Sequence, residues 1–85
     1  MIIEFPAADP VQAALGRRLR LVREARGLSA QALAGRCGFS TARLGLAETG
    51  RTRLTSAELH ALITELRIPL GLLYASADVS RLRPL

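Results

Sequence analysis

The chain has 85 residues, enough for one small domain with a single hydrophobic core. Its formal net charge is +5, and all 12 basic residues are arginines, whose planar side chains suit contacts with phosphate and guanine. No apolar stretch approaches the roughly 20 residues that cross a bilayer, and the first residues lack the basic start of a secretory signal. The composition therefore predicts a cytoplasmic protein and favours nucleic acid over membrane as its partner. A GC-rich genome would also explain arginine in place of lysine, but not where the arginines lie.

Residues 1–10 are predicted to form an arm, because IIEF is short and β-prone and Asp9-Pro10 is a typical helix start. The first helix is predicted from about Val11 to Arg26, with Gly27 at its end. Its apolar residues recur at helical spacing: Leu15, Leu19 and Val22. Its other faces carry Arg17, Arg18, Arg20, Arg23 and Arg26.

The stretch from Leu28 to Gly50 predicts two short helices joined by a tight, glycine-centred turn. Ser29 and Ser40 are placed to cap them, since a serine hydroxyl accepts a hydrogen bond from a free amide at a helix start. Gly38 lies where the first of these helices ends and positive φ is needed. The positions expected to be buried are Leu33, Ala34, Cys37, Leu44 and Ala47. Two helices set at a steep angle by such a turn form a helix-turn-helix, whose second helix lies in a DNA groove.

A fourth helix is predicted from a cap at Thr55 or Ser56 to about Leu66, with an amphipathic pattern of apolar residues. Ile68-Pro69 breaks the chain, and residues 70–75 are predicted to form a short fifth helix. Strands are expected, at most, at the two ends of the chain. Residues 11–75 would thus form one all-α domain of five short helices, followed by a tail at residues 76–85.

The chain from Leu15 to Tyr74 resembles the Cro/Xre-type helix-turn-helix domains of phage repressors and bacterial regulators. Four pieces carry the resemblance in order and spacing: LGRRLRLVREARGLS, LAGRCGFS, Glu48-Thr49-Gly50 and ELHALITELRIPLGLLY. The resemblance implies a phage-repressor-like bundle. It also implies that Arg23, late in the first helix, pairs with Glu48 at the end of the helix that enters the groove, and so stabilises that helix.

The resemblance implies DNA contacts on both sides of the motif. With Leu44 and Ala47 facing inward, the positions expected to face the bases are Thr41, Ala42, Arg43, Gly45 and Leu46. The residues expected at the phosphates are Ser29, Gln31, Ser40, Arg51, Thr52 and Arg53. The alternative for the last three is an ordinary solvated loop.

Apolar residues near both ends exceed what one small core can hold, which favours burial against a second copy of the chain. The candidates for this dimer interface are Ile2, Ile3, Phe5, Leu72, Val79 and Leu82. The IIEF arm is expected to add as a strand to a neighbour. Scattered exposure of apolar residues is the alternative.

Cys37 is the only cysteine, so the chain forms no internal disulfide and no thiolate metal cluster. His60 has no second ligand at metal-binding spacing and is expected on the surface. Glu48 is the only carboxylate in the helix-turn-helix, with no catalytic arrangement around it. The sequence therefore predicts no metal, no cofactor, no small-molecule substrate and no enzyme activity.

Together these features predict a sequence-specific transcriptional regulator that binds double-stranded DNA as a homodimer, with residues 41–49 in the major groove. Such a protein would be associated with the nucleoid when bound. One alternative is the antitoxin of a toxin-antitoxin pair, which would regulate its own promoter. The other is a protein-interaction adaptor on the same scaffold. The apolar Gly45-Leu46 pair favours the adaptor, whereas Arg51 and Arg53 argue against it.

Overall fold

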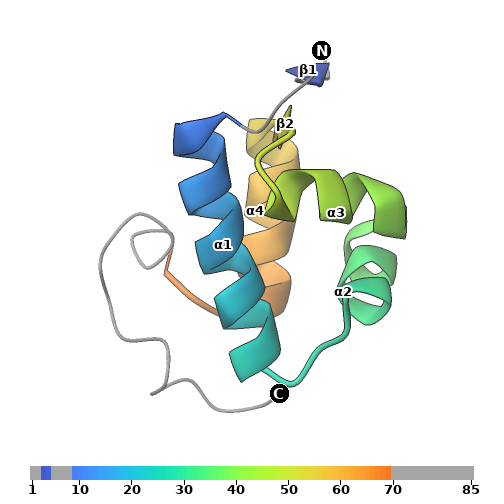
Figure 1. Ribbon diagram of the computed structural model, residues 1–85. Helices are drawn as coiled ribbons and strands as arrows, with labels where there is room; N and C mark the ends of the chain where they lie inside the picture. The colour runs from blue at the N-terminus through green and yellow to red at the C-terminus, as the bar shows by residue number, and fades with distance from the viewer. Residues whose placement is uncertain (1–2, 5–8, 70–85) are drawn as a thin grey trace.

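The computed structural model describes residues 3–4 and 9–69. In chain order the elements of this part are β1 (Ile3–Glu4), α1 (Pro10–Ala25), α2 (Ala30–Cys37), α3 (Thr41–Glu48), β2 (Thr52–Arg53) and α4 (Ser56–Leu66) (Figure 1). The predicted all-α class is confirmed, and each of the first four predicted helices is present. The fifth predicted helix, at 70–75, and the tail at 76–85 lie outside the described residues. No helix of the described part has the length and apolar character needed to span a membrane.

The helices begin where short polar side chains accept hydrogen bonds from free backbone amides. Asp9, Ser29, Ser40 and Thr55 each do so at the start of one helix. Of the two caps predicted for α4, Thr55 is the one found. The Glu58 side chain closes a capping box by accepting a hydrogen bond from the backbone amide of Thr55. The starts of the helices are therefore set by contacts within a single turn.

The helices α2 and α4 each end at a residue in the left-handed conformation, and the end of α4 also accepts hydrogen bonds from an arginine side chain. Gly38 ends α2 at φ 76°, and Arg67 ends α4 at φ 54°, an uncommon value for a residue with a Cβ. The Arg26 guanidinium donates hydrogen bonds to the carbonyl oxygens of Leu66 (2.9 Å) and Arg67 (2.8 Å). The C-terminal end of α1 therefore supplies donors to the last carbonyls of α4, which lack partners within their own helix.

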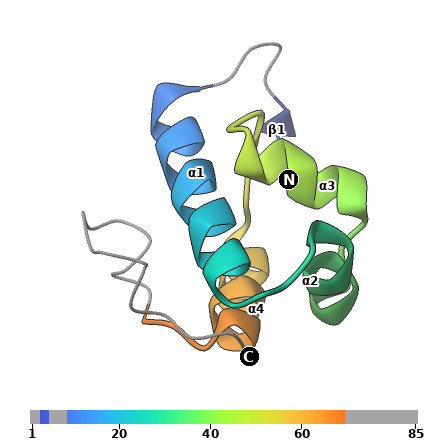
Figure 2. The same cartoon turned by 60° about the horizontal axis from the view of Figure 1, so that its bottom comes forward.

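A single core lies between the four helices. Figures 1 and 2 show α2 and α3 together on one side of the bundle, with α1 and α4 on the other. The buried apolar cluster draws on all four helices and on the residues after α4: Leu19, Val22, Leu33, Ala34, Leu44, Leu62, Leu66 and Ile68. Because each helix contributes to one contiguous cluster, the geometry of α2 and α3 is set by the whole bundle.

Two glycines let the end of α3 approach α1 closely. A Cβ on Gly16 would lie 2.5 Å from the carbonyl oxygen of Glu48. A Cβ on Gly50, where φ is +76°, would lie 2.5 Å from the Cα of Ala13. Neither distance leaves room for a methyl group, so backbone packs directly on backbone at this point. The C-terminal end of α3 is thereby held against the first half of α1.

A short antiparallel ladder corrects the expectation that strands lie only at the chain ends. Ile3 pairs with Arg53, and Glu4 pairs with Thr52. In this structure the strand of the arm pairs with β2 of its own chain. The addition of the arm to a second copy of the chain stays a prediction. Two residues carry no alternating pattern long enough to recognise, which is why the sequence gives no sign of β2.

Candidate nucleic-acid interface

One side of α3 faces the core and the other faces solvent. Leu44 and Ala47 are buried, whereas Thr41 and Ala42 are exposed. A Cβ added at Gly45 would meet nothing within 4 Å, so the surface there is open. Of the other residues expected at the bases, Gly45 and Leu46 are half-buried. The outward side of α3 is therefore lined by small or apolar side chains that allow another surface to approach closely.

Arg43, the fifth residue expected at the bases, is turned toward the protein. Its guanidinium forms a bidentate ion pair with Glu58, with Nη2–Oε1 at 2.7 Å and Nε–Oε2 at 3.1 Å. It also donates to the hydroxyl of Thr52 and to the carbonyl oxygen of Arg53 (3.2 Å). The side chain of Arg43 is only 11% exposed. This corrects the expectation that Arg43 is a long donor facing the bases, because its donors connect α3 to β2 and α4.

Thr52 is the second correction, since it was expected at a phosphate. The structure buries it to 1% exposure, with its hydroxyl accepting a hydrogen bond from Arg43. Arg51 and Arg53, on either side of it, are exposed. A residue buried between two exposed ones shows the alternation of a strand, whereas the sequence predicted that all three residues face a phosphate or solvent.

Glu58 is the residue that sequence reasoning missed. The Arg43 guanidinium, followed by the hydrogen bond from the Thr55 amide, lowers the pKa of Glu58 below its usual value, against the opposing effect of burial. A sequence signal for half of this arrangement was available, because Thr55 and Glu58 have the spacing of a capping box. The partner on α3 left no local signal, since it is 15 residues away.

The structure brings Arg23 and Glu48 together as a second bidentate pair. Arg23 Nε lies 2.7 Å from Glu48 Oε2, and Arg23 Nη2 lies 3.2 Å from Oε1. The remaining nitrogen, Nη1, donates to the carbonyl oxygen of Leu28 at 2.9 Å. The side chains are 10% and 8% exposed, so the pair is nearly buried. One arginine therefore connects α1, the end of α3 and the loop before α2.

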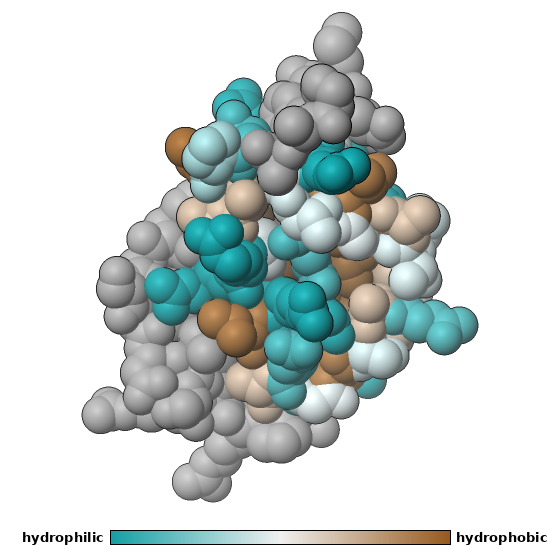
Figure 3. Space-filling view, in the orientation of Figure 1, coloured by the Kyte–Doolittle hydropathy of each residue, from teal (hydrophilic) through white to brown (hydrophobic). Residues whose placement is uncertain are grey.

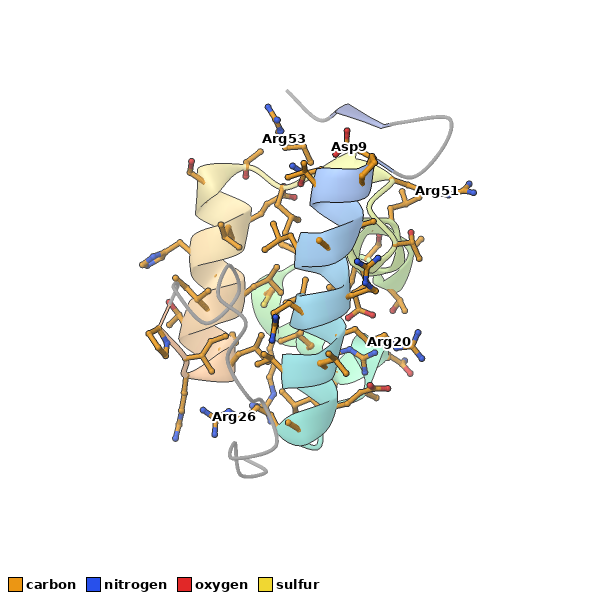
Figure 4. All side chains as sticks on the ribbon, turned by 60° about the vertical axis from the view of Figure 1, so that its left-hand side comes forward. Asp9, Arg20, Arg26, Arg51 and Arg53 are labelled. Atoms are coloured by element: carbon orange, nitrogen blue, oxygen red, sulfur yellow. The ribbon has the colours of Figure 1, made fainter. Side chains whose placement is uncertain are left out.

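The other residues expected at phosphates are exposed. Ser29 and Ser40 lie at the N-termini of α2 and α3, whose free amides and helix dipoles favour anions, and Gln31 lies in the first turn of α2. Figure 4 shows Arg51 and Arg53 at the same end of the molecule as Asp9 but pointing in different directions. In that view Arg51 extends toward the side on which α3 lies.

The structure describes one of the six residues expected in a dimer interface. Ile2, Phe5, Leu72, Val79 and Leu82 lie outside the described residues, and for Ile3 the strand pairing with Arg53 is what the structure describes.

Neither Cys37 nor His60 belongs to a metal site within the described residues, which contain no group of three or more potential ligands placed around one point. Cys37 is half-buried against the core. Burial, together with the charge of Glu65, raises the pKa of its thiol. His60 is exposed on α4, where it was expected.

Comparison with known proteins places this geometry in a family. A model of the helix-turn-helix domain matches residues 14–73, and the chain belongs to this family. A search of curated proteins finds no match. The match and the solved structures described next confirm the resemblance to Cro/Xre-type domains, a class of DNA-binding transcription regulators.

Two regulators of known structure share the fold. The chain is 31% identical to C.AhdI, a restriction-modification controller protein from Aeromonas hydrophila; the alignment covers 76% of this chain and 98% of that one, with a TM-score of 0.73. It is 26% identical to ClgR, a clp gene regulator from Corynebacterium glutamicum. The alignment with one ClgR structure covers 78% of this chain and 70% of the ClgR chain, with a TM-score of 0.74. The alignment with a second ClgR structure covers 81% of this chain and 90% of the ClgR chain, with a TM-score of 0.73.

Proposed function

We propose that the protein is a sequence-specific transcriptional regulator that places α3 in the major groove of double-stranded DNA. The observation that carries the proposal is the way α3 is held. Two largely buried ion pairs, Arg23–Glu48 at its end and Arg43–Glu58 in its first turn, attach it to the bundle. Its outward side keeps only small or apolar side chains. A rigid helix with an open face suits insertion into a groove about 12 Å wide.

The outward residues suit apolar and small-donor contacts with bases. The methyl group of Ala42 and the side chain of Leu46 can contact a thymine methyl, and the hydroxyl of Thr41 can donate or accept a hydrogen bond. Gly45 lets the backbone of α3 approach the base edges. The phosphate contacts proposed are those of Ser29, Gln31, Ser40, Arg51 and Arg53. The function is one of binding, with no catalytic step.

We further propose that the regulator binds as a homodimer. Two copies related by a two-fold axis would contact half-sites centred about 34–36 Å apart, one turn of DNA, or a multiple of that spacing. The likeness to a controller protein and a gene regulator supports the regulatory task. The copy number on DNA is tested by analytical ultracentrifugation of the complex.

The decisive experiment selects bound sequences from random DNA with the purified protein and then titrates salt on the best sequence. We expect a pseudo-palindromic motif whose affinity falls steeply as salt rises, because phosphate contacts release counterions. Arg51→Gln should weaken binding and lower the slope of log K against log salt. Arg67→Gln, which removes the same charge from the exposed end of α4, is the matched control and should leave the slope unchanged.

Enrichment of no sequence, with equal behaviour of both variants, would refute the proposal and favour the adaptor. An antitoxin would still select a motif in this experiment. It is distinguished by a small toxin encoded next to it that co-purifies with the protein.

A further inference from the structure

The face of α1 next to the end of α3 carries two exposed arginines, Arg17 and Arg20, that take no part in the ion pairs of α3. Gly16 and Arg23 both face α3, since Gly16 lies against the carbonyl of Glu48 and Arg23 pairs with its carboxylate. Arg20 lies between them, about 6 Å along the helix axis from Gly16 and about 40° around it. Arg17 lies one turn earlier on the same exposed side. Arg20 therefore emerges from α1 beside the C-terminal end of α3.

The surroundings of Arg20 are open to solvent. Arg17, Arg20, Leu21 and Glu24 line a shallow hollow on this side of α1. Figure 3 shows hydrophilic side chains gathered in the middle of this face, where Figure 1 places α1. Figure 4 shows Arg20 and Arg51 projecting to the same side of the molecule, the side on which α3 lies. Two basic groups from different elements thus flank the end of α3.

The only described ion pair of Arg20 is weak. Its Nε lies 3.5 Å from Oε2 of Glu24, one turn away on α1, and the two side chains are 62% and 50% exposed. An exposed pair of this kind contributes little to stability, because water screens both charges. A negatively charged phosphate can therefore take the place of the Glu24 carboxylate beside Arg20. The Glu48 carboxylate, which pairs with Arg23 and is nearly buried, is not open to such an exchange.

We propose that Arg17 and Arg20 form a second phosphate-contact surface of the protein, and that Arg20 exchanges Glu24 for a backbone phosphate when DNA binds. The occupant is the sugar-phosphate backbone of duplex DNA just outside the bases that α3 contacts. The inference rests on the proposed function, since it requires α3 to lie in the groove. It extends the interface from the helix-turn-helix onto α1, and it gives Glu24 the role of an intramolecular competitor.

The test measures affinity over a salt series for the wild type, Arg20→Gln, Glu24→Gln, Arg51→Gln and the control Arg67→Gln. The DNA is the selected site with about ten base pairs of flank on each side, compared with the same site trimmed at the contacted bases. Glutamine favours helix about as well as arginine and glutamate do, so the fold is retained. Circular dichroism verifies this for each variant.

Each arginine lost from a phosphate should lower the slope of log K against log salt by about 0.9, or about 1.8 for the two copies in a dimer. Arg20→Gln should show this decrease on the flanked DNA and none on the trimmed DNA. Glu24→Gln should bind the flanked DNA more tightly, by about two- to five-fold per protomer, the equivalent of one exposed ion pair. If the Arg20–Glu24 pair serves only to stabilise α1, neither substitution should change the affinity for DNA or the slope.

Two outcomes overturn the proposal. If Arg20→Gln keeps the wild-type slope while Arg51→Gln lowers it, the protein binds DNA through the helix-turn-helix alone. In that case this inference fails while the proposed function stands. If the wild type binds neither DNA, the proposed function fails and this inference fails with it. Tighter binding of Glu24→Gln together with a reduced slope for Arg20→Gln supports it.

Discussion

The carboxylate of Glu58 holds three parts of the molecule together, and its charge can be removed without changing its shape. One oxygen, Oε1, accepts from Arg43 Nη2 at 2.7 Å and from the Thr55 amide at 2.9 Å. The other oxygen, Oε2, accepts from Arg43 Nε at 3.1 Å. In Glu58→Gln one oxygen is replaced by an NH₂ group, which has no lone pair to offer. A donor would then face a donor, and the Arg43 guanidinium would lose its counter-charge.

The expected cost follows from the exposure of the pair. Hydrogen bonds to charged groups contribute about 1.5–3 kcal/mol each, and breaking a fully buried pair costs about 3–5 kcal/mol. The Arg43 and Glu58 side chains are 11% and 19% exposed, so water enters part of the way and reduces the loss. We expect Glu58→Gln to lower the free energy of unfolding by about 2 kcal/mol. In a domain of this size that corresponds to a fall in Tm of roughly 8–16 °C.

The assay is thermal and urea unfolding followed by circular dichroism at neutral pH. Glu65→Gln is the matched control, since it makes the same chemical change on the same helix away from Arg43, and we expect it to cost less than about 0.5 kcal/mol. A double-mutant cycle with Arg43→Gln isolates the coupling, which should exceed about 1 kcal/mol. If Glu58→Gln is as stable as Glu65→Gln, the ion pair does not hold α3 to α4 and the reasoning is refuted.

Three further outcomes are expected. The pKa of Glu58 is lowered in the folded protein, so the Glu58 carboxylate stabilises the fold fully above its unfolded-state pKa, and this stabilisation is lost as the pH falls through the folded-state pKa. The free energy of unfolding, measured by urea unfolding at a series of acidic pH values, should therefore fall more steeply with decreasing pH for the wild type than for Glu58→Gln. Gly16→Ala should lower Tm strongly, because the added Cβ has no room against the carbonyl of Glu48. Gly45→Ala, where the added Cβ meets open space, should raise the free energy of unfolding by up to about 1 kcal/mol. Equal melting temperatures of these two variants would contradict the close packing of α1 on the end of α3. Glu48→Gln should cost about 3 kcal/mol or more, since it leaves the nearly buried Arg23 charge without its counter-charge, and chemical denaturation measures this loss.

Much of the helical framework followed from the sequence, because its determinants are local. Asp9, Ser29 and Ser40 cap the helices that they were predicted to cap, and Gly38 adopts the positive φ expected of it. Each of these features depends on hydrogen bonds or sterics within one helical turn. The apolar spacing that predicted Leu44 and Ala47 as inward-facing is likewise a property of one helix. The pairing of Arg23 with Glu48, 25 residues apart, was expected only from the resemblance to a family.

The direction of the functional side chains was decided by tertiary structure. A helical pattern places Arg43 at the flank of α3, but only the position of α4 determines that Glu58 is within reach of its guanidinium. The burial of Thr52 and the pairing of β1 with β2 depend in the same way on segments that are distant along the chain. The sequence by itself therefore determined which segments are helices and which of their sides face inward, because those properties repeat with the helical period. Only the folded bundle decided which arginines are bound within the protein and which remain available to a partner, because that depends on carboxylates brought near from other elements.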